Sequence, residues 1–139
     1  YVTMYSPLQM AADMPEHYEA HMDAFRFIKD VPVDWKKSVY LDAEPGEYIV
    51  VARQDKKSDA WYVGGVTNED ARDYTLEFGF LPSDKEFLAT IYADAPDTDG
   101  FDNPETYKIS EMQVNSNTST KIHMARGGGF AISLAPKGE

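Results

Sequence analysis

From about residue 38 onward, apolar and polar residues alternate along the chain almost to its C-terminus. A period of two places successive side chains on opposite faces of a β-strand, so this pattern predicts strands rather than helices. Polar or glycine-bearing segments interrupt the alternation at the spacing that is typical of an antiparallel sandwich or barrel. Strands are predicted at residues 38–43, 47–53, 60–67, 73–80, 86–94, 106–114, 118–125 and 128–134.

Two of the predicted strands contain stretches that are apolar on both faces, at residues 48–52 and 61–63. A strand without a polar face must be covered on both sides, so we expect both stretches to lie in the middle of a sheet. Between the first two strands, Pro45 and Gly46 suit a type II turn, because proline fixes one dihedral angle and glycine accepts a positive φ. Glycine residues 127–129 lack the lysine and the following helix of a phosphate-binding loop, so a hairpin turn or a close backbone approach is predicted there.

The residues ahead of the strands have a different pattern. Residues 1–5 predict a short buried strand, and residues 8–29 predict an amphipathic helix, with Asp13 and Pro15 as start signals. The helix should end before Pro32, because the residue preceding a proline avoids helical geometry. A strand followed by a helix of this length is the unit from which β/α folds are built. Inside the chain the helix is the expected cover for the second face of the sheet, and outside the chain a neighbouring domain is the expected cover.

The overall composition excludes several functions. Acidic residues outnumber basic ones by 24 to 13, which gives a net charge of −11, so nucleic acid and anionic membrane surfaces are not expected partners. The absence of cysteine excludes disulfides, thiol catalysis and cysteine-bound metals. No apolar stretch approaches the ~20 residues of a membrane span, and no secretory signal is recognised. Because the chain begins at Tyr1, inside an apolar run, we expect it to be part of a longer polypeptide.

Two groups of residues have metal-binding chemistry without a complete pattern. His17 and His21 are four residues apart, a spacing that lets two imidazoles share a metal on a helix, but no third ligand is evident. Residues 94–103 are dense in the oxygen donors that calcium prefers, although their spacing does not fit a calcium-binding helix–loop–helix motif. Packing or surface histidines and a solvated acidic loop are the favoured interpretations, and no residue is assigned to a metal.

The sequence contains no recognisable catalytic constellation. Glycoside hydrolysis, for example, needs two facing carboxylates, and no pair of acidic residues stands out. Trp35, Trp61 and Tyr62 could form a sugar-stacking platform, whereas packing in the core is the commoner fate of strand aromatics. No catalytic and no cofactor-binding residue is therefore assigned, and these three aromatics are the candidate binding residues.

Five blocks of sequence occur in the order that they have in one known family. They are residues 5–13 (YSPLQMAAD), 27–35 (FIKDVPVDW), 46–53 (GEYIVVAR), 61–68 (WYVGGVTN) and 127–131 (GGGFA). The set resembles glycoside hydrolase family 97, a family of bacterial α-glucosidases and α-galactosidases, and it extends over nearly the whole chain. Residues 5–13 resemble the last strand and helix of the catalytic barrel, and residues 27–35 resemble its junction with the C-terminal domain.

The resemblance implies a domain organisation. Family members have an N-terminal β-supersandwich, a catalytic (β/α)8 barrel and a C-terminal sandwich, and they are typically periplasmic. Residues 1–35 are then the terminal strand and helix of the barrel plus a linker, and residues 36–139 are the C-terminal β-sandwich. The expected fold is mainly β, an antiparallel β-sandwich of about eight strands preceded by one strand–helix unit left over from the barrel. The expected location is periplasmic or secreted, in a bacterium.

The resemblance also implies a function. The catalytic carboxylates and the calcium ion of the family belong to parts of the polypeptide that precede this chain, so no cofactor is expected in this chain. The chain should be a non-catalytic C-terminal domain that supports the barrel and contributes to a homo-oligomer, inactive when isolated because one β/α unit cannot build a barrel cleft. A free-standing carbohydrate-binding module and a pure assembly domain are the alternatives. The apolar stripe of the helix consists of Tyr18, Met22 and Phe25, with His21 and Ile28 alongside. We expect Met4, Tyr5 and this stripe to pack onto the sandwich or onto a second copy.

Overall fold

The computed structural model describes residues 1–138 and confirms a mainly β chain. Two short helices, α1 (Pro15–Glu19) and α2 (Met22–Asp30), precede all of the strands. The strands are β1 (Trp35–Glu44), β2 (Tyr48–Asp55), β3 (Trp61–Thr67), β4 (Arg72–Glu77), β5 (Phe87–Asp94), β6 (Tyr107–Val114), β7 (Ser119–Met124) and β8 (Gly129–Pro136). Each of the strands predicted from residue 38 onward is present, and its ends lie within a few residues of the prediction.

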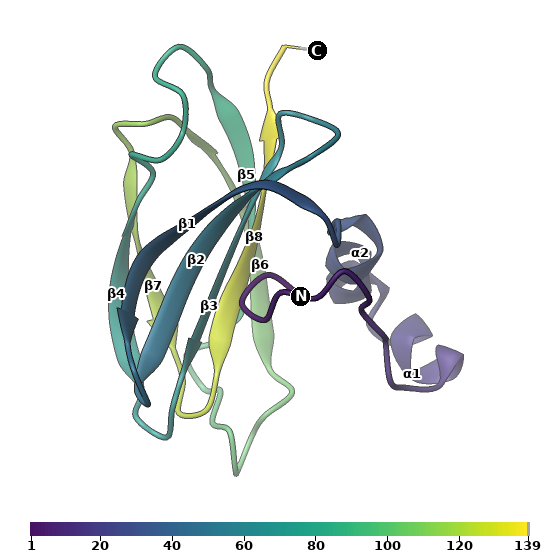
Figure 1. The fold of residues 1–139 in the computed structure, drawn as a ribbon. Helices are drawn as coiled ribbons and strands as arrows, with labels where there is room; N and C mark the ends of the chain where they lie inside the picture. Colours follow the sequence, from purple (N-terminus) through teal and green to yellow (C-terminus); the bar gives the residue numbers. More distant parts are fainter. Residues whose placement is uncertain (139) are drawn as a thin grey trace.

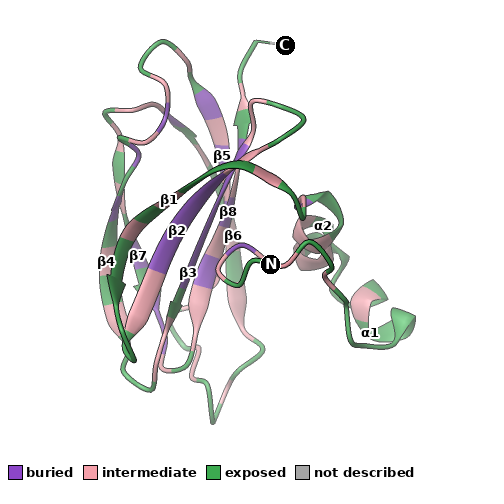
Figure 2. Cartoon of the chain, in the orientation of Figure 1, coloured by how far each residue is buried: buried purple, intermediate pink, exposed green. Residues whose placement is uncertain are grey.

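The strands form two antiparallel sheets of unequal size. The larger sheet has the order β1-β2-β3-β8-β5-β6, and the smaller sheet consists of β4 paired with β7. The small sheet covers one face of the large sheet, and the N-terminal segment with its two helices lies on the other face (Figure 1). The predicted antiparallel sandwich is therefore confirmed. As predicted, β2 and β3 lie inside the large sheet, with both faces covered over much of their length (Figure 2).

The main core lies between the two sheets. Side chains of β2, β3, β5 and β8 that point toward the small sheet meet the inward side chains of β4 and β7. Two phenylalanines, Phe78 after β4 and Phe87 on β5, are fully buried at this interface. The other fully buried large side chains are Leu76, Met124, Ile132, Leu134, Val50, Val51 and Val63. A second, smaller cluster on the opposite face of the large sheet is described below.

Both glycine-based predictions are confirmed. Gly46 has a φ of 84°, and the amide of Glu47 donates to the carbonyl of Glu44 at 2.9 Å, which closes the tight turn between β1 and β2. In the turn between β7 and β8, Gly127 also has a positive φ, of 69°. At Gly129 a Cβ atom would lie 2.2 Å from the carbonyl oxygen of Gly65, so the backbones of β3 and β8 approach too closely for a side chain at this point.

The N-terminal 35 residues differ from the prediction. Residues 1–5 form no strand, although Val2 is buried, because the segment lies over the face of the large sheet at Gly64 and not beside an edge strand with which it could pair. The helix predicted for residues 8–29 is two helices that begin only at Pro15. It is interrupted because His21 adopts φ −132° and ψ 47°, outside helical geometry. The end of α2 at Asp30, ahead of Pro32, agrees with the prediction. Neither helix of residues 1–138 is long and apolar enough to cross a membrane.

Candidate functional site

The helix α2 packs onto the outer face of the large sheet, the face away from the small sheet. The ring of Phe27 meets Tyr62 of β3 and Tyr92 of β5 edge-on, with centroid distances of 5.9 and 5.4 Å. The hydroxyl of Tyr62 donates to the backbone carbonyl of Asp30 at the end of α2, at 3.2 Å. Burial raises the pKa of Tyr62, and nearby carboxylates add to the effect. The predicted role of the helix as a cover is therefore confirmed, although Phe27 makes the contact and the predicted stripe does not.

The first residues of the chain are anchored to the same face by a buried arginine. Val2 is 3% exposed and lies over Gly64, where a Cβ atom would come within 2.9 Å of the Val2 Cβ. Arg53 of β2 is 4% exposed, and its Nε donates to the carbonyl of Val2 at 2.6 Å. The Nη1 of Arg53 donates to the Oγ of Ser38 on β1, also at 2.6 Å. Arg53 thus ties the N-terminal segment to two strands of the sandwich.

A ridge of apolar side chains projects from this anchored segment into solvent. Met4, Leu8 and Met10 are each at least 75% exposed, and Met14 is 60% exposed. Several exposed large apolar side chains within one short segment are typical of a contact site for another protein surface. Met4 and Tyr5 are exposed and are not buried against their own sandwich, so the other expected alternative, a contact with a second copy, stays a prediction. We refer to Met4, Leu8, Met10 and Met14 as the N-terminal ridge.

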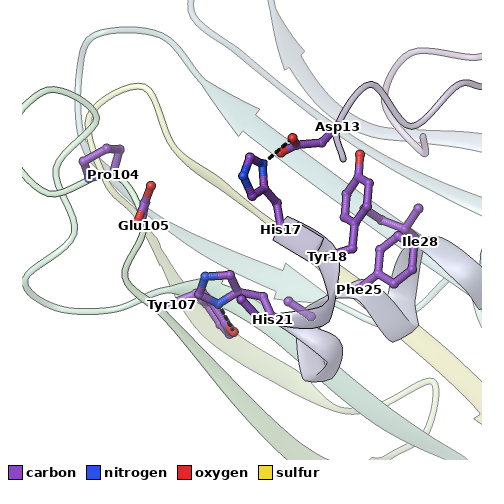
Figure 3. Close-up of a pocket in the computed structure, with 11 residues that line it drawn as sticks. Asp13, His17, Tyr18, His21, Phe25, Ile28, Pro104, Glu105 and Tyr107 are labelled. Carbon is purple, nitrogen blue, oxygen red and sulfur yellow. Dashed lines mark hydrogen bonds and ion pairs between the residues drawn. The ribbon is translucent and has the colours of Figure 1, made fainter. Parts of the chain in front are cut away.

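A hollow of about 590 Å³ separates the helices from the segment that leads into β6 (Figure 3). His17 hydrogen-bonds to Asp13 at 2.6 Å, and this bond lowers the pKa of the Asp13 carboxyl. His21 lies 3.3 Å from the hydroxyl of Tyr107, which donates to Asp23 at 2.7 Å and lowers the pKa of that carboxyl.

The helix break separates the two histidines, and each has its own hydrogen-bond partner. Within residues 1–138, no group of three side chains of the metal-binding types lies close enough to hold an ion. His17 and His21 thus make separate local polar contacts, with Asp13 and with Tyr107.

The acidic loop between β5 and β6 uses its carboxylates internally. Asp94 accepts hydrogen bonds from the amides of Ala125 and Gly129, both at 2.8 Å. Asp99 accepts two hydrogen bonds from the guanidinium of Arg126, at 2.7 and 3.1 Å, together with backbone amide bonds from its own loop. These bonds, above all those from Arg126, lower the pKa of Asp99 to about 2. The loop is therefore tied to the β7–β8 turn by its own side chains.

This ion pair predicts a loss of stability in acid. Because the pKa of Asp99 is lower in the folded chain than its ordinary value of 3.8, its contribution is complete above that value and is lost as the pH falls from about 4 to about 2. We expect the wild-type chain to be more stable than the Asp99→Asn variant at pH 5 and the difference to shrink steadily below pH 4. Urea unfolding of both chains at several pH values measures this difference. A stability difference between the two chains that stays constant with pH would contradict a stabilising role for the ion pair of Asp99 with Arg126.

The three candidate sugar-stacking residues do not form a platform. Trp61 is 3% exposed and packs against Phe80 inside the sandwich. Tyr62, the next residue on the strand, points to the opposite face, where it contacts Trp35 at a centroid distance of 5.8 Å. The indole nitrogens of Trp35 and Trp61 are both buried. Trp61 and Tyr62 are therefore buried on opposite faces of one strand, and only Trp35 of the three residues is partly exposed.

The pKa shifts of the described carboxyl groups come from hydrogen bonds that hold the fold together. A glycosidase needs a general acid whose pKa is raised by an apolar surrounding. Each described carboxyl whose pKa is shifted is shifted downward, and in every case the largest cause is a hydrogen bond from a neighbouring side chain. The features that stand out are instead the anchored N-terminal segment and its ridge. They define a β-sandwich domain that carries an anchored N-terminal segment with exposed apolar side chains.

Comparison with known proteins identifies the family. Residues 34–135 match the family described as "Glycosyl-hydrolase 97 C-terminal, oligomerisation", and the chain belongs to it. A retaining alpha-galactosidase of Bacteroides thetaiotaomicron is 37% identical over 134 residues, which are 96% of this chain and 20% of that protein. A probable retaining alpha-galactosidase of Streptomyces bingchenggensis is 30% identical over 92 residues, 66% of this chain and 14% of that protein.

Solved structures agree with this assignment. Glycoside hydrolase family 97 enzyme structures from Pseudoalteromonas sp. strain K8, in complex with panose and with acarbose, superpose with a TM-score of 0.94 at 41% identity. The match covers 97% of this chain and 21% of the enzyme. The chain therefore spans about a fifth of the length of the proteins that it resembles.

Proposed function

We propose that this chain is the C-terminal, non-catalytic domain of a larger family 97 α-glycosidase, where it supports the catalytic barrel and contributes to oligomer contacts. The observation that carries the proposal is the N-terminal ridge. Its side chains are exposed although Arg53 and Val2 hold the segment firmly on the sandwich, so the ridge is positioned for a surface outside this chain. The relatives are about five times as long, and the proposal is that their preceding domains supply such a surface.

The proposed division of the chain follows from the same idea. Residues 36–139 are the sandwich domain, and the family match that begins at residue 34 supports this boundary. Residues 1–35 are the end of the barrel and the linker. In this proposal residues 1–5 become a barrel strand when the neighbouring barrel strands are present to pair with them, since an isolated strand without a partner leaves its backbone groups unsatisfied.

The parent protein is proposed to act on α-glycosides. The two curated relatives are named as α-galactosidases, and the solved family 97 enzyme was crystallised with panose and with acarbose. The names of the relatives and the ligands of the solved enzyme both fit the class of α-glycosidases, which includes α-glucosidases and α-galactosidases. A periplasmic or secreted bacterial location and a calcium ion held by the catalytic part of the parent complete the proposal.

A free-standing carbohydrate-binding module is the weaker alternative. Its binding face would require exposed aromatics, and Trp61 and Tyr62 are buried on opposite sides of one strand. It would also leave the N-terminal ridge without a role. Saturable quenching of tryptophan fluorescence by maltooligosaccharides or melibiose would favour this alternative.

The docking role predicts that one substitution has different effects in two contexts. Leu8 is 75% exposed in this chain, so Leu8→Asp should leave the melting temperature of the isolated chain unchanged. In the longer polypeptide that includes the upstream coding region, the same change would bury a charge against the barrel and lower the melting temperature by several degrees.

Glu19→Lys, on the exposed side of α1, is the matched control and should be silent in both contexts. The isolated chain should also fail to cleave nitrophenyl α-glucoside and α-galactoside. Equal melting temperatures for the Leu8→Asp and wild-type longer polypeptides would contradict the docking role, and turnover by the isolated chain would contradict the non-catalytic assignment.

A further inference from the structure

A groove of about 440 Å³ lies between α2 and the outer face of the large sheet. One wall is α2, which contributes Asp23, Arg26 and Phe27, and the floor is formed by strands β3, β5, β6 and β8. Small-molecule sites are usually hollows of about 300–1,000 Å³, so the groove has the size of a ligand site. Wall and floor both belong to this chain, and the groove therefore exists without any other protein surface.

The floor of the groove is a row of polar side chains that crosses four strands. Tyr62 of β3 pairs with Ser133 of β8, and Ser133 pairs in turn with Thr90 of β5. Thr90 pairs with Glu111 of β6. Directly paired side chains share a face of the sheet, and Tyr62 reaches the end of α2, so the whole row lies on the outer face. On this face of β8 the residues on either side of Ser133 are both alanine, and these small side chains make the groove.

Polar groups of the groove keep hydrogen-bonding capacity that the fold does not use. Within residues 1–138, the hydroxyls of Tyr92 and Ser133 make no hydrogen bond to another residue. Burial raises the pKa of Tyr92, and Arg26 and three carboxylates lie close enough to influence it, so these charges gather around its hydroxyl. The Nε of Arg26 lies 3.5 Å from a carboxylate oxygen of Asp30, which is a loose pair. The groove therefore offers both donors and acceptors to a ligand.

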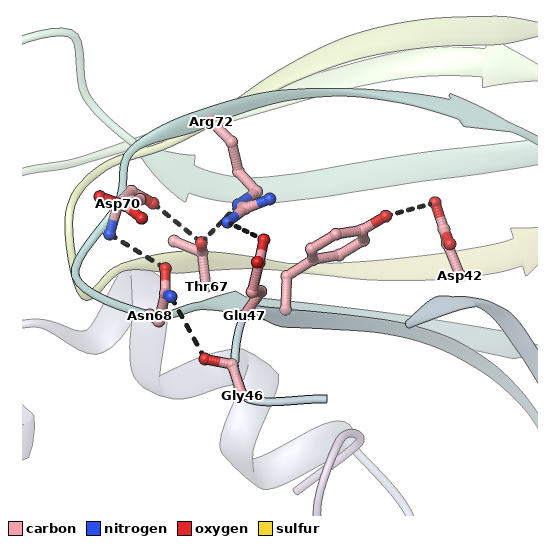
Figure 4. Close-up of polar contacts among 8 residues, drawn as sticks. Asp42, Gly46, Glu47, Thr67, Asn68, Asp70 and Arg72 are labelled. Atoms are coloured by element: carbon pink, nitrogen blue, oxygen red, sulfur yellow. Dashed lines mark hydrogen bonds and ion pairs between the residues drawn. The ribbon is translucent and has the colours of Figure 1, made fainter. Parts of the chain in front are cut away.

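The polar cluster at the β1–β2 turn is the contrasting case (Figure 4). Arg72 donates to Glu47 at 3.2 Å and to the hydroxyl of Thr67 at 2.9 Å, and its guanidinium lies 4.7 Å from the ring centroid of Tyr48. The hydroxyl of Tyr48 donates to Asp42 at 2.9 Å. These groups satisfy one another, and the hollow beside the turn is lined largely by apolar side chains. This end of the sandwich therefore offers little to a polar ligand.

The charges of the groove fit a neutral, hydroxyl-rich ligand. The groove contains one guanidinium, that of Arg26, and three carboxylates, those of Asp23, Asp30 and Glu111. An anion is repelled by this excess and by the net charge of −11, and a cation would have to lie beside Arg26. A hydroxyl group donates to a carboxylate and accepts from a guanidinium, so a ligand with several hydroxyls satisfies both kinds of group.

Apolar side chains among these polar groups narrow the ligand class further. Leu88 of β5, Ile109 of β6 and Phe27 of α2 line the same groove. A sugar ring has C–H groups that pack against apolar and aromatic side chains while its hydroxyls form hydrogen bonds. A wholly apolar ligand would instead take water from the carboxylates without replacing its hydrogen bonds. A sugar therefore matches the groove as a whole.

We propose that the groove between α2 and the polar row of the large sheet binds a neutral di- or trisaccharide. The site goes beyond the proposed support of the barrel, and its residues are separate from the N-terminal ridge. Only the choice of α-linked sugars as ligands rests on the proposed function, because the parent protein is proposed to act on α-glycosides. The site differs from that of a free-standing binding module, because the sugar lies in a groove that α2 helps to build and not on a platform of exposed aromatics.

The test is a titration of the isotope-labelled chain with melibiose and with maltotriose, followed by the amide resonances in NMR spectra. Amides around Thr90 and Ser133 should shift and saturate, with a dissociation constant on the order of 1 mM, because a small groove open to solvent makes few contacts. Amides of β4 and β7, on the other side of the sandwich, should stay unchanged. Spermidine and glucuronate, as a cationic and an anionic probe, should give no saturable shift in the groove.

Two substitutions should weaken the binding by different amounts. Ser133→Leu fills the groove above β8 and should weaken binding about tenfold or more, because the ligand and the new side chain compete for the same space. Tyr92→Phe keeps the ring and removes one free hydroxyl, which should weaken binding about fivefold. Thr75→Leu, on the exposed outer face of β4, is the matched control and should bind as the wild type does. The NMR spectrum of each variant shows that it is folded before affinities are compared.

Four outcomes would overturn the proposal. They are the absence of a saturable shift with either sugar, shifts centred away from β5 and β8, a Ser133→Leu variant that binds as well as the wild type, and saturation of the groove by spermidine or glucuronate in place of the sugars. Leu8→Asp should leave the sugar titration unchanged, because Leu8 lies on the N-terminal ridge and does not line the groove. A failed docking role and a failed sugar site are therefore told apart by separate variants.

Discussion

Replacing Phe87 with alanine is expected to destabilise the chain by about 3–5 kcal/mol, which is the usual cost of removing a buried phenylalanine from a core. Phe87 is completely buried on β5 and belongs to the cluster between the two sheets. The small sheet has only two strands, β4 and β7, so few of its side chains can move inward to fill the cavity. The cost should therefore lie in the upper part of that range, and the midpoint of urea unfolding should fall accordingly.

Phe101→Ala provides the matched control for Phe87→Ala. Phe101 is 71% exposed, and its contact is with Arg126 at the surface, so its removal should cost about 1 kcal/mol or less. Both variants should unfold with the wild-type dependence on urea concentration, since neither alters the surface that unfolding exposes. Equal midpoints for the two variants would mean that the two sheets do not share one cooperative core.

The sandwich was predictable because two local signals agree along residues 38–134. Alternation sets which residues form strands, and turn residues set where they end, so the predicted and observed strand limits differ by only a few residues. The pairing order was not predictable, because β3 pairs with β8 and β4 pairs with β7 across long stretches of intervening chain. Nothing local in the sequence specifies these pairings.

The stacking hypothesis for Trp61 and Tyr62 failed for a reason that the sequence already contained. Adjacent residues on a strand point to opposite faces, so they cannot build one platform. The sequence also predicts that this stretch is covered on both sides, which is what the structure has. Because both faces are covered and the side chains alternate, Trp61 lies in the core between the sheets and Tyr62 lies in the smaller cluster on the outer face.

Arg53 was missed as a functional residue because its position follows from tertiary contacts. In the sequence it is the first charged residue after an apolar run and has the pattern of the solvated end of a strand. Its burial depends on Val2 and the N-terminal segment, which lie some fifty residues earlier in the chain. No periodicity connects the two, whereas a buried guanidinium bound to a backbone carbonyl is plain in the structure.

The two outward faces of the sandwich differ in polarity. The N-terminal ridge projects from the outer face of the large sheet. The small sheet presents Asp73, Thr75, Lys121 and His123 outward and has the polarity of a solvated surface. The proposed docking surface for the barrel is therefore carried by the large sheet. A change that loosens the N-terminal segment should affect the N-terminal ridge and spare the core.

Arg53→Met is the substitution that should loosen the N-terminal segment and leave the core between the sheets intact. Methionine keeps much of the length and the apolar stem of arginine but removes both hydrogen bonds, to the Val2 carbonyl at 2.6 Å and to Ser38 at 2.6 Å. A buried carbonyl without a partner costs about 1–3 kcal/mol, so the chain should lose about that much stability. The contacts of the guanidinium with the rings of Tyr5 and Tyr40 are lost as well.

The loss at Arg53 should be localised to the N-terminal segment. Amide hydrogen exchange should quicken at residues 1–5 and stay slow in β5 and β8, because the core between the sheets does not depend on this anchor. Arg26→Met is the control, since the side chain of Arg26 is 78% exposed and its pair with Asp30 is a surface contact that contributes little. Uniformly faster exchange across the whole sandwich would show that Arg53 stabilises the fold as such. Faster exchange confined to the first residues would establish it as the residue that holds the N-terminal ridge in position.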